Sequence, residues 1–220
     1  CSITLSDNRA DARPSESRSR VPRSRRSGLP GRGAWRHIEW FPPLTMNQNT
    51  FVAFLRGVMP SGRNAVKMAD VRAVLSDHGF NDVRTWIQSG NIILNTSLTA
   101  EAAAEHIHHL LKTALQVDLP VIIKTQTQLR EALEGNPFTG AAFDIRRVFF
   151  ALCNQPLSDT AGLQQLDLGS ECLCIRPHCA YMYIPGSAAR SRLGNVFLEK
   201  KLGLTLTTRN ANTLQKMASF

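Results

Sequence analysis

Two short polar runs stand out in the sequence as places where chemistry could occur. The first is IQSGN at 87–91, which sets small polar residues between two apolar runs, and the second is TTRNANT at 207–213. Hydroxyl, amide and guanidinium groups of this kind bind carboxylates and phosphates through hydrogen bonds and charge. A structural role explains the same residues, since Gly and Asn favour turns and one Asn of the second run can cap a helix. That structural alternative pairs Arg209 with a carboxylate.

A third polar segment follows the first apolar run and carries three cations. Arg56, Arg63 and Lys67 lie around Gly57 and Gly62, which allow close approach of the backbone. We expect a helix to begin just after this loop, and the free N–H groups of a helix N-terminus favour an anion. The composition of the loop therefore indicates an anion site.

The apolar runs predict the elements that position these segments. A β-rich run over 51–58 precedes an amphipathic helix that ends at Gly79. Two strands over 83–88 and 91–95 follow, and 119–125 has the composition of a buried strand. Between them Thr99 can cap a helix with one apolar stripe. The stripe consists of Ala103, Ile107, Leu110, Leu111 and Ala114. The predicted order is β-α-β-β-α-β.

The same order returns after a short helical stretch over 127–138. Its predicted elements are a strand over 146–153, a helix over 160–166, strands over 171–176 and 179–185, a helix over 190–202, a strand over 204–208 and a last helix over 212–220. The helix over 190–202 should turn Leu193, Val196, Phe197 and Lys200 to one face. Tandem units of this order predict an α+β fold made of two ferredoxin-like subdomains, each with an antiparallel sheet. The expected boundaries are 46–125 and 146–220, joined by a helical linker over 126–145.

This topology predicts which polar segments meet. A right-handed crossover makes the first and second strands of a unit parallel. The end of the first strand and the hairpin between the second and third strands then share one edge of the sheet. We therefore expect the loop from Arg56 to Asn64 to lie beside the hairpin residues 88–91.

Composition indicates an ordinary soluble globular protein for most of the chain. Of 220 residues, 43% are hydrophobic and 20% charged, and no stretch is apolar enough to span a membrane. Residues 1–45 hold nine Arg and four acidic residues, which is +5 of the net charge of +9. This Arg-, Ser- and Pro-rich segment is expected to be a disordered basic extension, either upstream sequence preceding a natural start at Met46 or a basic arm for nucleic acid. Five cysteines, an odd number, fit reduced thiols in the cytoplasm.

Other constellations carry less weight. The run ECLCIRPHCAY at 171–181 contains zinc-ligand residue types, but its spacing differs from that of zinc knuckles, and we expect no metal. His106 and His109 can share a helix face without a Cys or carboxylate at ligand spacing, which favours a surface role. The chain has no G-x-S-x-G, P-loop or G-x-G-x-x-G motif. The strand-like NIILN at 91–95 lacks the stacking aromatics of RNA-recognition modules.

The motifs carry a family resemblance. FVAFLRGVMPSGRNAVKMADVRAVLSDHGFNDVRTWIQSGNIIL at 51–94, GNPF at 135–138 and TTRNANT at 207–213 resemble the bacterial domain of unknown function 1697 family, over about Met46 to Phe220. The family pattern has an LRG-(I/V)-N-x-G-G-x-N loop, an IQSGN hairpin and a TRNWNT ending. This chain departs from it at 59–61 and at Ala211, where Trp is usual. The resemblance implies two ferredoxin-like subdomains in one compact unit and no known activity.

We therefore expect a cytoplasmic bacterial protein that binds a small anionic or phosphorylated ligand. The loop cations would neutralise the ligand's charge, and the hairpin side chains would hydrogen-bond it. The candidate ligand residues are Arg56, Gly57, Gly62, Arg63, Asn64, Lys67, Gln88, Ser89, Gly90, Asn91, Thr208, Arg209, Asn210, Asn212 and Thr213. No cofactor is expected, and neither catalysis nor the oligomeric state can be predicted. The alternative function is a nucleic-acid (RNA) binding module that uses its basic surface.

Overall fold

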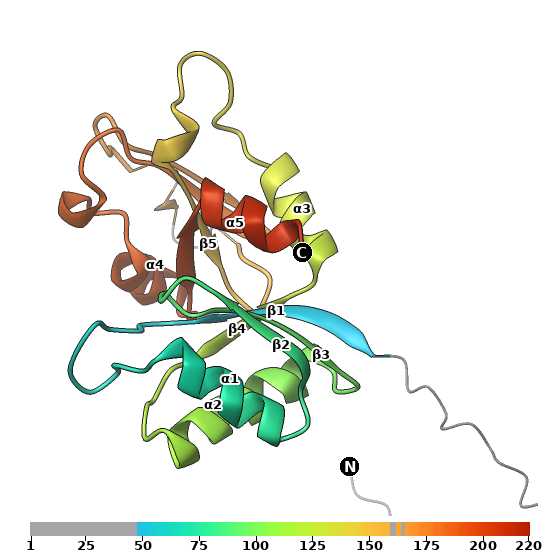
Figure 1. The fold of residues 1–220 in the computed structure, drawn as a ribbon. Helices are drawn as coiled ribbons and strands as arrows, with labels where there is room; N and C mark the ends of the chain where they lie inside the picture. The colour runs from blue at the N-terminus through green and yellow to red at the C-terminus, as the bar shows by residue number, and fades with distance from the viewer. Residues whose placement is uncertain (1–47, 159–161, 164–165) are drawn as a thin grey trace, which may run out of the picture. The chain divides into compact units, whose positions relative to one another are not determined.

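Two four-stranded antiparallel sheets form the framework of the protein (Figure 1). The computed structural model describes residues 48–158, 162–163 and 166–220. The expected basic extension over 1–45 lies outside the described residues, as does most of the helix expected over 160–166. Over the described residues the strand order predicted for each repeat can be compared with the observed one.

The two sheets have the same strand order. The first orders its strands as β2-β3-β1-β4, and the second as β6-β7-β5-β8. The strands are β1 (Asn49–Leu55), β2 (Asn81–Trp86), β3 (Asn91–Thr96), β4 (Val121–Lys124), β5 (Val148–Leu152), β6 (Cys172–Arg176), β7 (Cys179–Tyr183) and β8 (Thr207–Asn210). In each sheet the first strand in sequence lies in the centre and pairs antiparallel with the third and the fourth. The repeat read from the sequence is confirmed at the level of strands.

Five α-helices complete the described secondary structure. They are α1 (Met68–Asp77), α2 (Ala100–Ala114), α3 (Gln126–Glu134), α4 (Asn195–Leu202) and α5 (Ala211–Ala218), with 3-10 turns η1 (Ile145–Arg147) and η3 (Ala188–Arg190). The Thr99 cap is confirmed, because its Oγ1 accepts the Ala102 N–H at 3.3 Å. Thr125 caps α3 in a capping box with Gln128. The side-chain caps at Thr99 and Thr125 therefore set where α2 and α3 begin.

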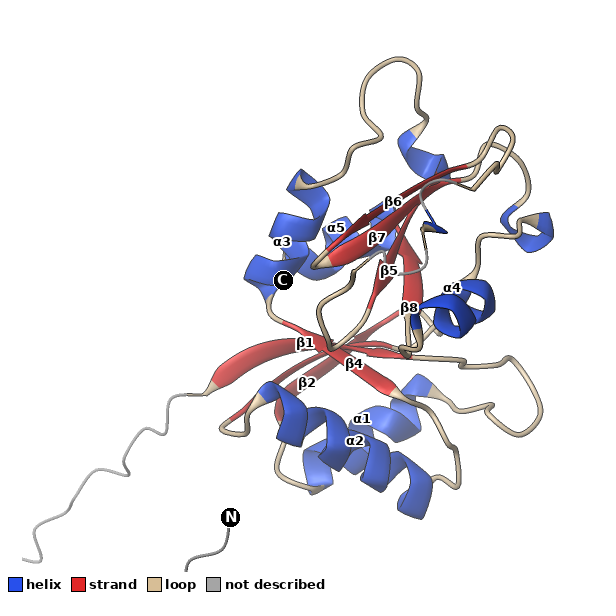
Figure 2. Cartoon of the chain, turned by 180° about the vertical axis from the view of Figure 1, so that it is seen from behind, coloured by secondary structure: helices blue, strands red, loops and turns tan. Residues whose placement is uncertain are grey.

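Three apolar clusters hold the elements together. Along β1, Phe51, Ala53 and Leu55 join the first cluster with α1 and α2, which cover one face of the first sheet (Figure 2). Val52 and Phe54 point to the opposite face, as the two-residue period of a strand requires. They belong to the middle cluster, which also contains residues of the second sheet, α3 and α5. The third cluster lies on the other face of the second sheet and includes Leu198 of α4. Both faces of both sheets are thus covered.

Three local predictions are wrong. Ala114 is exposed rather than part of the buried stripe of α2. Helix α4 begins at Asn195 and not near 190, because η3 and the extended Gly194 precede it. Val196 of the predicted buried face is 73% exposed, and the buried residue of α4 is Leu198. The last strand is shifted towards the C-terminus, since the Leu206 N–H donates to the Glu199 carboxylate at 2.9 Å rather than to a strand.

None of the helices in the described part of the chain has the length and apolar character needed to cross a membrane.

Candidate functional site

The loop and the hairpin meet at one edge of the first sheet, as predicted. The Leu55 N–H at the end of β1 donates to the Gly90 carbonyl at 2.8 Å. The Gln88 Nε2 donates to the Val66 carbonyl, just before α1, at 2.6 Å. Gln88 is therefore engaged in holding the hairpin against the loop.

Gly90 and Asn91 are structural residues of this hairpin. Gly90 has a φ of +79°, and a Cβ added there would lie 2.7 Å from the Leu55 Cβ and 2.9 Å from the Val58 Cγ2. Only glycine fits such a position without displacement. The Asn91 side chain is fully buried, and its Nδ2 donates to the Trp86 carbonyl and to the Ser89 hydroxyl, both at 3.0 Å. These contacts fix the bend itself.

Arg56 is paired within the protein. Its Nε and Nη2 donate to the two oxygens of the Glu199 carboxylate at 3.1 and 3.0 Å. Such a two-point pair compensates the charge that sequence reasoning had assigned to a ligand. Arg63 and Lys67 are exposed, and Lys67 precedes α1 without a side-chain capping bond. The loop cations therefore do not converge with the hairpin on one cavity.

Arg209 joins the TTRNANT run to the hairpin. Its Nε donates to the Asn91 Oδ1 at 2.6 Å, and its Nη2 donates to the carbonyls of Leu55 and Ser89, both at 3.0 Å. The Nη1 donates to the Thr207 hydroxyl at 2.8 Å and to the Thr208 carbonyl at 2.9 Å. All five N–H groups of the guanidinium thus have partners.

No carboxylate pairs with Arg209 within the described ranges, so the carboxylate partner of the structural alternative is absent there. The guanidinium also lies 5.3 Å from the centre of the Phe54 ring. Burial, and next the nearby charge of Arg56, lower the pKa of Arg209 to about 10. The Arg209 guanidinium therefore keeps its positive charge at neutral pH, and no carboxylate in the described structure neutralises that charge.

A cavity of about 400 Å³ opens beside this arginine. It brings together residues that are more than a hundred positions apart in sequence: Ser89 of the hairpin with Thr208, Arg209, Asn210 and Thr213. We call it the hairpin pocket. The described residues that line it are Ile87, Ser89, Phe149, Met182, Ile184, Ala188, Leu193, Gly194, Asn195, Thr208, Arg209, Asn210 and Thr213.

Asn210 confirms one structural prediction. Its Oδ1 accepts the Thr213 N–H at 2.9 Å, so it caps α5. The first turn of α5, with its positive dipole end, therefore begins at the hairpin pocket. Thr213 is only 8% exposed, lines the pocket, and its hydroxyl has no hydrogen-bond partner among the residues that the structure describes. A hydroxyl in a pocket wall without a partner is a donor available to a ligand.

Asn195 and Ile87 complete the pocket from other elements. The Asn195 Oδ1 accepts the Thr208 hydroxyl at 2.6 Å, which leaves its Nδ2 without a partner in the described structure. Ile87 has a φ of +50° and is 54% exposed. A β-branched residue rarely adopts this conformation, and such strain concentrates at functional sites. No sequence signal marked either residue, because one begins an ordinary helix and the other sits in an apolar run.

The predicted ligand residues are distributed over more than one place. Five of them, Ser89, Thr208, Arg209, Asn210 and Thr213, line the hairpin pocket. Three others, Arg56, Gly57 and Asn64, line a separate cavity of about 520 Å³. The remaining ones, Gly62, Arg63, Lys67, Gln88, Gly90, Asn91 and Asn212, line neither. The structure thus brings the TTRNANT run to the hairpin, a meeting that sequence reasoning did not predict.

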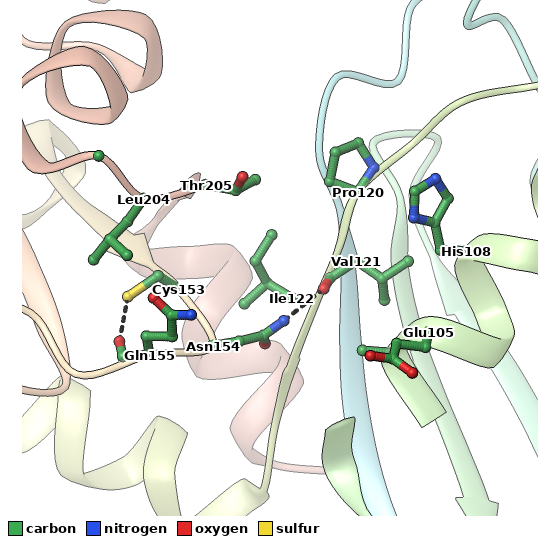
Figure 3. Close-up of a pocket in the computed structure, with 12 residues that line it drawn as sticks. Glu105, His108, Pro120, Val121, Ile122, Cys153, Asn154, Gln155, Leu204 and Thr205 are labelled. Atoms are coloured by element: carbon green, nitrogen blue, oxygen red, sulfur yellow. Dashed lines mark hydrogen bonds between the residues drawn. The ribbon is translucent and has the colours of Figure 1, made fainter. Parts of the chain in front are cut away.

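A further cavity of about 370 Å³ lies next to the second one and shares Pro120 and 203–205 with it (Figure 3). Asn154 spans it: its Nδ2 donates to the Val121 carbonyl at 2.9 Å, and its Oδ1 accepts the Ile123 N–H at 2.8 Å. The Cys153 thiol donates to the Gln155 carbonyl, and burial raises the pKa of that thiol. A protonated thiol is a poor nucleophile, so this cavity lacks an activated cysteine.

The cysteines and histidines of the described structure do not form a set of metal ligands. Among the described residues no group of three or more His, Cys, Asp or Glu side chains is placed to hold a metal ion. The His108 Nε2 contacts the Asp118 carboxylate at 2.7 Å on the surface, and the His106 ring packs 5.6 Å from that of Phe80. These histidines have structural neighbours.

The described structure has a mixed α/β fold with two four-stranded antiparallel sheets. The profile of the family described as protein of unknown function (DUF1697) matches residues 48–181, and the chain belongs to this family. The resemblance read from the motifs is confirmed. A conserved bacterial protein of Streptococcus pneumoniae has a similar solved structure, with 22% identity, a TM-score of 0.58, and coverage of 78% of this chain and 98% of that one. No curated protein matches the chain.

Proposed function

We propose that this protein binds a small anionic ligand in the hairpin pocket. The observation that carries the proposal is the Arg209 guanidinium, which lies in the pocket wall with no carboxylate partner in the described structure. An uncompensated cation in a partly desolvated wall attracts an anion more strongly than one in water. The α5 N-terminus adds to the same positive potential.

This proposal keeps the anionic ligand predicted from the sequence but uses fewer of the predicted ligand residues. Arg56 was expected to bind the ligand, but its pair with Glu199 leaves no free charge. The hairpin and the TTRNANT run contribute the ligand contacts instead. Ser89 and Thr213 supply hydroxyls, and Arg209 supplies charge.

A variant that introduces a negative charge into the pocket wall tests the proposal. Asn195→Asp keeps an oxygen where Asn195 accepts the Thr208 hydroxyl, and an acidic residue in the first turn of α4 is favourable for the helix. The variant should therefore fold, while it places a negative charge in the pocket wall. We expect it to lose at least tenfold in affinity for any anion that binds there, measured by calorimetry after a thermal-shift screen of inorganic phosphate, sugar phosphates, nucleotides and short carboxylates.

Asn81→Asp is the matched control, since Asn81 is exposed at the opposite end of β2 from the hairpin. It makes the same change of net charge and should leave the affinity within about twofold, because charges separated by more than a Debye length are screened. Equal losses in both variants, or no binding of any anion to the wild type, would overturn the proposal.

Each half of the molecule is, we further propose, a ferredoxin-like subdomain. The support is the identical strand order of the two sheets, with the first and third strands of each unit adjacent and antiparallel. A cytoplasmic bacterial setting is part of the same proposal. It is supported by the four cysteines in the described residues, all of them free thiols, and by the bacterial source of the similar solved structure.

Nucleic-acid binding stays the alternative, and one observation limits its form. RNA-recognition modules of this strand order stack bases on an open sheet face. Here Val52, Phe54 and Ile93 of the first sheet are buried in the middle cluster with residues of the second sheet. An oligonucleotide would have to use a different surface. Affinity for an oligonucleotide that falls steeply with salt would support the alternative.

A further inference from the structure

The hairpin pocket has an apolar floor, which limits what kind of anion it can hold. Phe149 of β5, which is half-buried, supplies accessible apolar surface, whereas Met182 of β7, Ile184 and Leu193 also line the pocket but are at most 2% exposed. Ala188 and the exposed side chain of Ile87 extend the same surface. Apolar walls of this kind bind hydrocarbon by removing it from water, at about 0.8 kcal/mol per methylene. A fully polar anion such as inorganic phosphate would leave them without contacts.

The arginine in the wall supplies charge but no free N–H group. Its Nε, Nη1 and Nη2 hydrogens are taken by Asn91, by Thr207 and Thr208, and by Leu55 and Ser89. The two-point grip by which arginine usually recognises phosphate is therefore not open to a ligand here. One positive charge held at a fixed position is best matched by one negative charge.

The donors that remain are few and fit a small head group. Four side-chain donors in the lining have no acceptor in the described structure: the hydroxyls of Thr213 and Ser89 and the Nδ2 groups of Asn195 and Asn210. Neutral donors of this kind on different elements suit the two oxygens of a carboxylate. A phosphate dianion carries a second negative charge, for which the described lining offers no second cation.

We infer that the ligand of the hairpin pocket is an organic monocarboxylate with an aliphatic or aromatic body. Its carboxylate lies at the end formed by Thr213, Asn195 and Arg209, and its body covers the accessible apolar surface of Phe149, Ala188 and Ile87. This inference rests on the proposed anion site and specifies its ligand class. The volume of about 400 Å³ is at the lower end for ligand pockets, which suits a body of a few carbons.

A homologous series measures the two parts of the ligand separately. Calorimetric titration with acetate, butyrate and hexanoate should show affinity rising about fourfold per methylene, the factor that corresponds to burial of a CH₂ group. Inorganic phosphate should bind more weakly than butyrate. Pentanol and n-pentylamine carry the same five-carbon body without the negative charge, and we expect both to bind at least tenfold more weakly than hexanoate.

Thr213→Val tests the head-group contact. Valine has nearly the shape of threonine, and the N–H of residue 213 can still donate to the Asn210 cap. We expect a loss of about tenfold for hexanoate, the value of one hydrogen bond to a charged group, with the same dependence on chain length. Thr205→Val, at an exposed position outside the pocket, should change nothing.

The possible results distinguish an error in the ligand class from an error in the proposed anion site. If sugar phosphates or nucleotides bind, respond to Asn195→Asp, and outcompete every carboxylate, the anion site stands and the ligand class is wrong. A carboxylate series without any dependence on chain length also overturns the inference. If no anion binds, both fail. A Thr213→Val protein that binds hexanoate as tightly as the wild type contradicts the placement of the carboxylate.

Discussion

Gly90 is the hairpin residue at which one added methyl group should cost most. Its φ is +79°, and a Cβ there would meet Leu55 and Val58 at 2.7 and 2.9 Å. We predict that Gly90→Ala lowers the free energy of unfolding by about 3 kcal/mol, from overpacking added to left-handed strain. Gly62→Ala is the control: its φ is +85°, but the space around it is open, so only about 1 kcal/mol should be lost. Chemical denaturation measures both, and equal losses would contradict the packing account.

Ile87 is strained in the folded protein and should be improvable. Asparagine adopts positive φ far more readily than isoleucine, and the side chain is largely exposed. We predict that Ile87→Asn raises the free energy of unfolding by about 1 kcal/mol while it weakens binding of hexanoate, since apolar area leaves the pocket wall. A variant that is less stable than the wild type in urea denaturation would show that Ile87 carries no removable strain.

At the scale of elements, the Arg56–Glu199 pair connects the loop after β1 to α4. Both side chains are 23% exposed, so the pair contributes modestly to stability. We predict that the double variant Arg56→Met, Glu199→Gln loses about 1 kcal/mol of stability and binds anions within twofold of the wild type. The double change keeps the net charge, and glutamine still accepts the Leu206 N–H. A large loss of anion affinity would return Arg56 to the ligand site.

The elements themselves were largely predictable, because periodicity reports on local environment. The buried residues of α1 and the stripe of α2 follow from spacings of three and four. Topology also predicted correctly that the hairpin meets the end of β1. The start of α4 was not predictable, since η3 and Gly194 interrupt an apolar pattern that continues through them.

The candidate site was only half predictable, and the reason lies in sequence separation. Arg209 contacts Asn91 and Leu55, which precede it by 118 and 154 positions, and Arg56 meets Glu199 across 143. Spacing within a segment says nothing about such partners. Sequence reasoning therefore identified the polar runs and included Arg209 among the candidates, but it assigned the neutralising charge to Arg56, Arg63 and Lys67, none of which lines the hairpin pocket.

At the scale of the whole molecule, the affinity for an anionic ligand should depend on pH through the charge of Arg209. Burial lowers the pKa of Arg209 to about 10, and among the described residues that line the pocket it is the one ionisable side chain. Below that value the group is charged in both folded and unfolded chains, so it adds no pH dependence to stability. As pH rises through about 10, the folded protein releases the proton first, which favours folding but removes the charge that attracts the ligand.

Affinity for hexanoate should consequently be constant between about pH 6 and pH 9 and fall as pH passes about 10. Calorimetry across this range checks the prediction, with circular dichroism to confirm that the protein stays folded. A steep change of affinity near neutral pH would instead implicate a histidine, and none stands among the lining residues that the structure describes.

The most direct test of the account is to locate a bound carboxylate. Crystals soaked in 6-bromohexanoate would give anomalous difference density for the bromine, and the ligand's orientation follows from that position. We predict one strong peak among Phe149, Ala188 and Ile87, with the carboxylate within hydrogen-bond distance of the Thr213 hydroxyl. A peak in the cavity lined by Pro120 and Thr205, or no peak in the hairpin pocket at saturating ligand, would contradict the central claim.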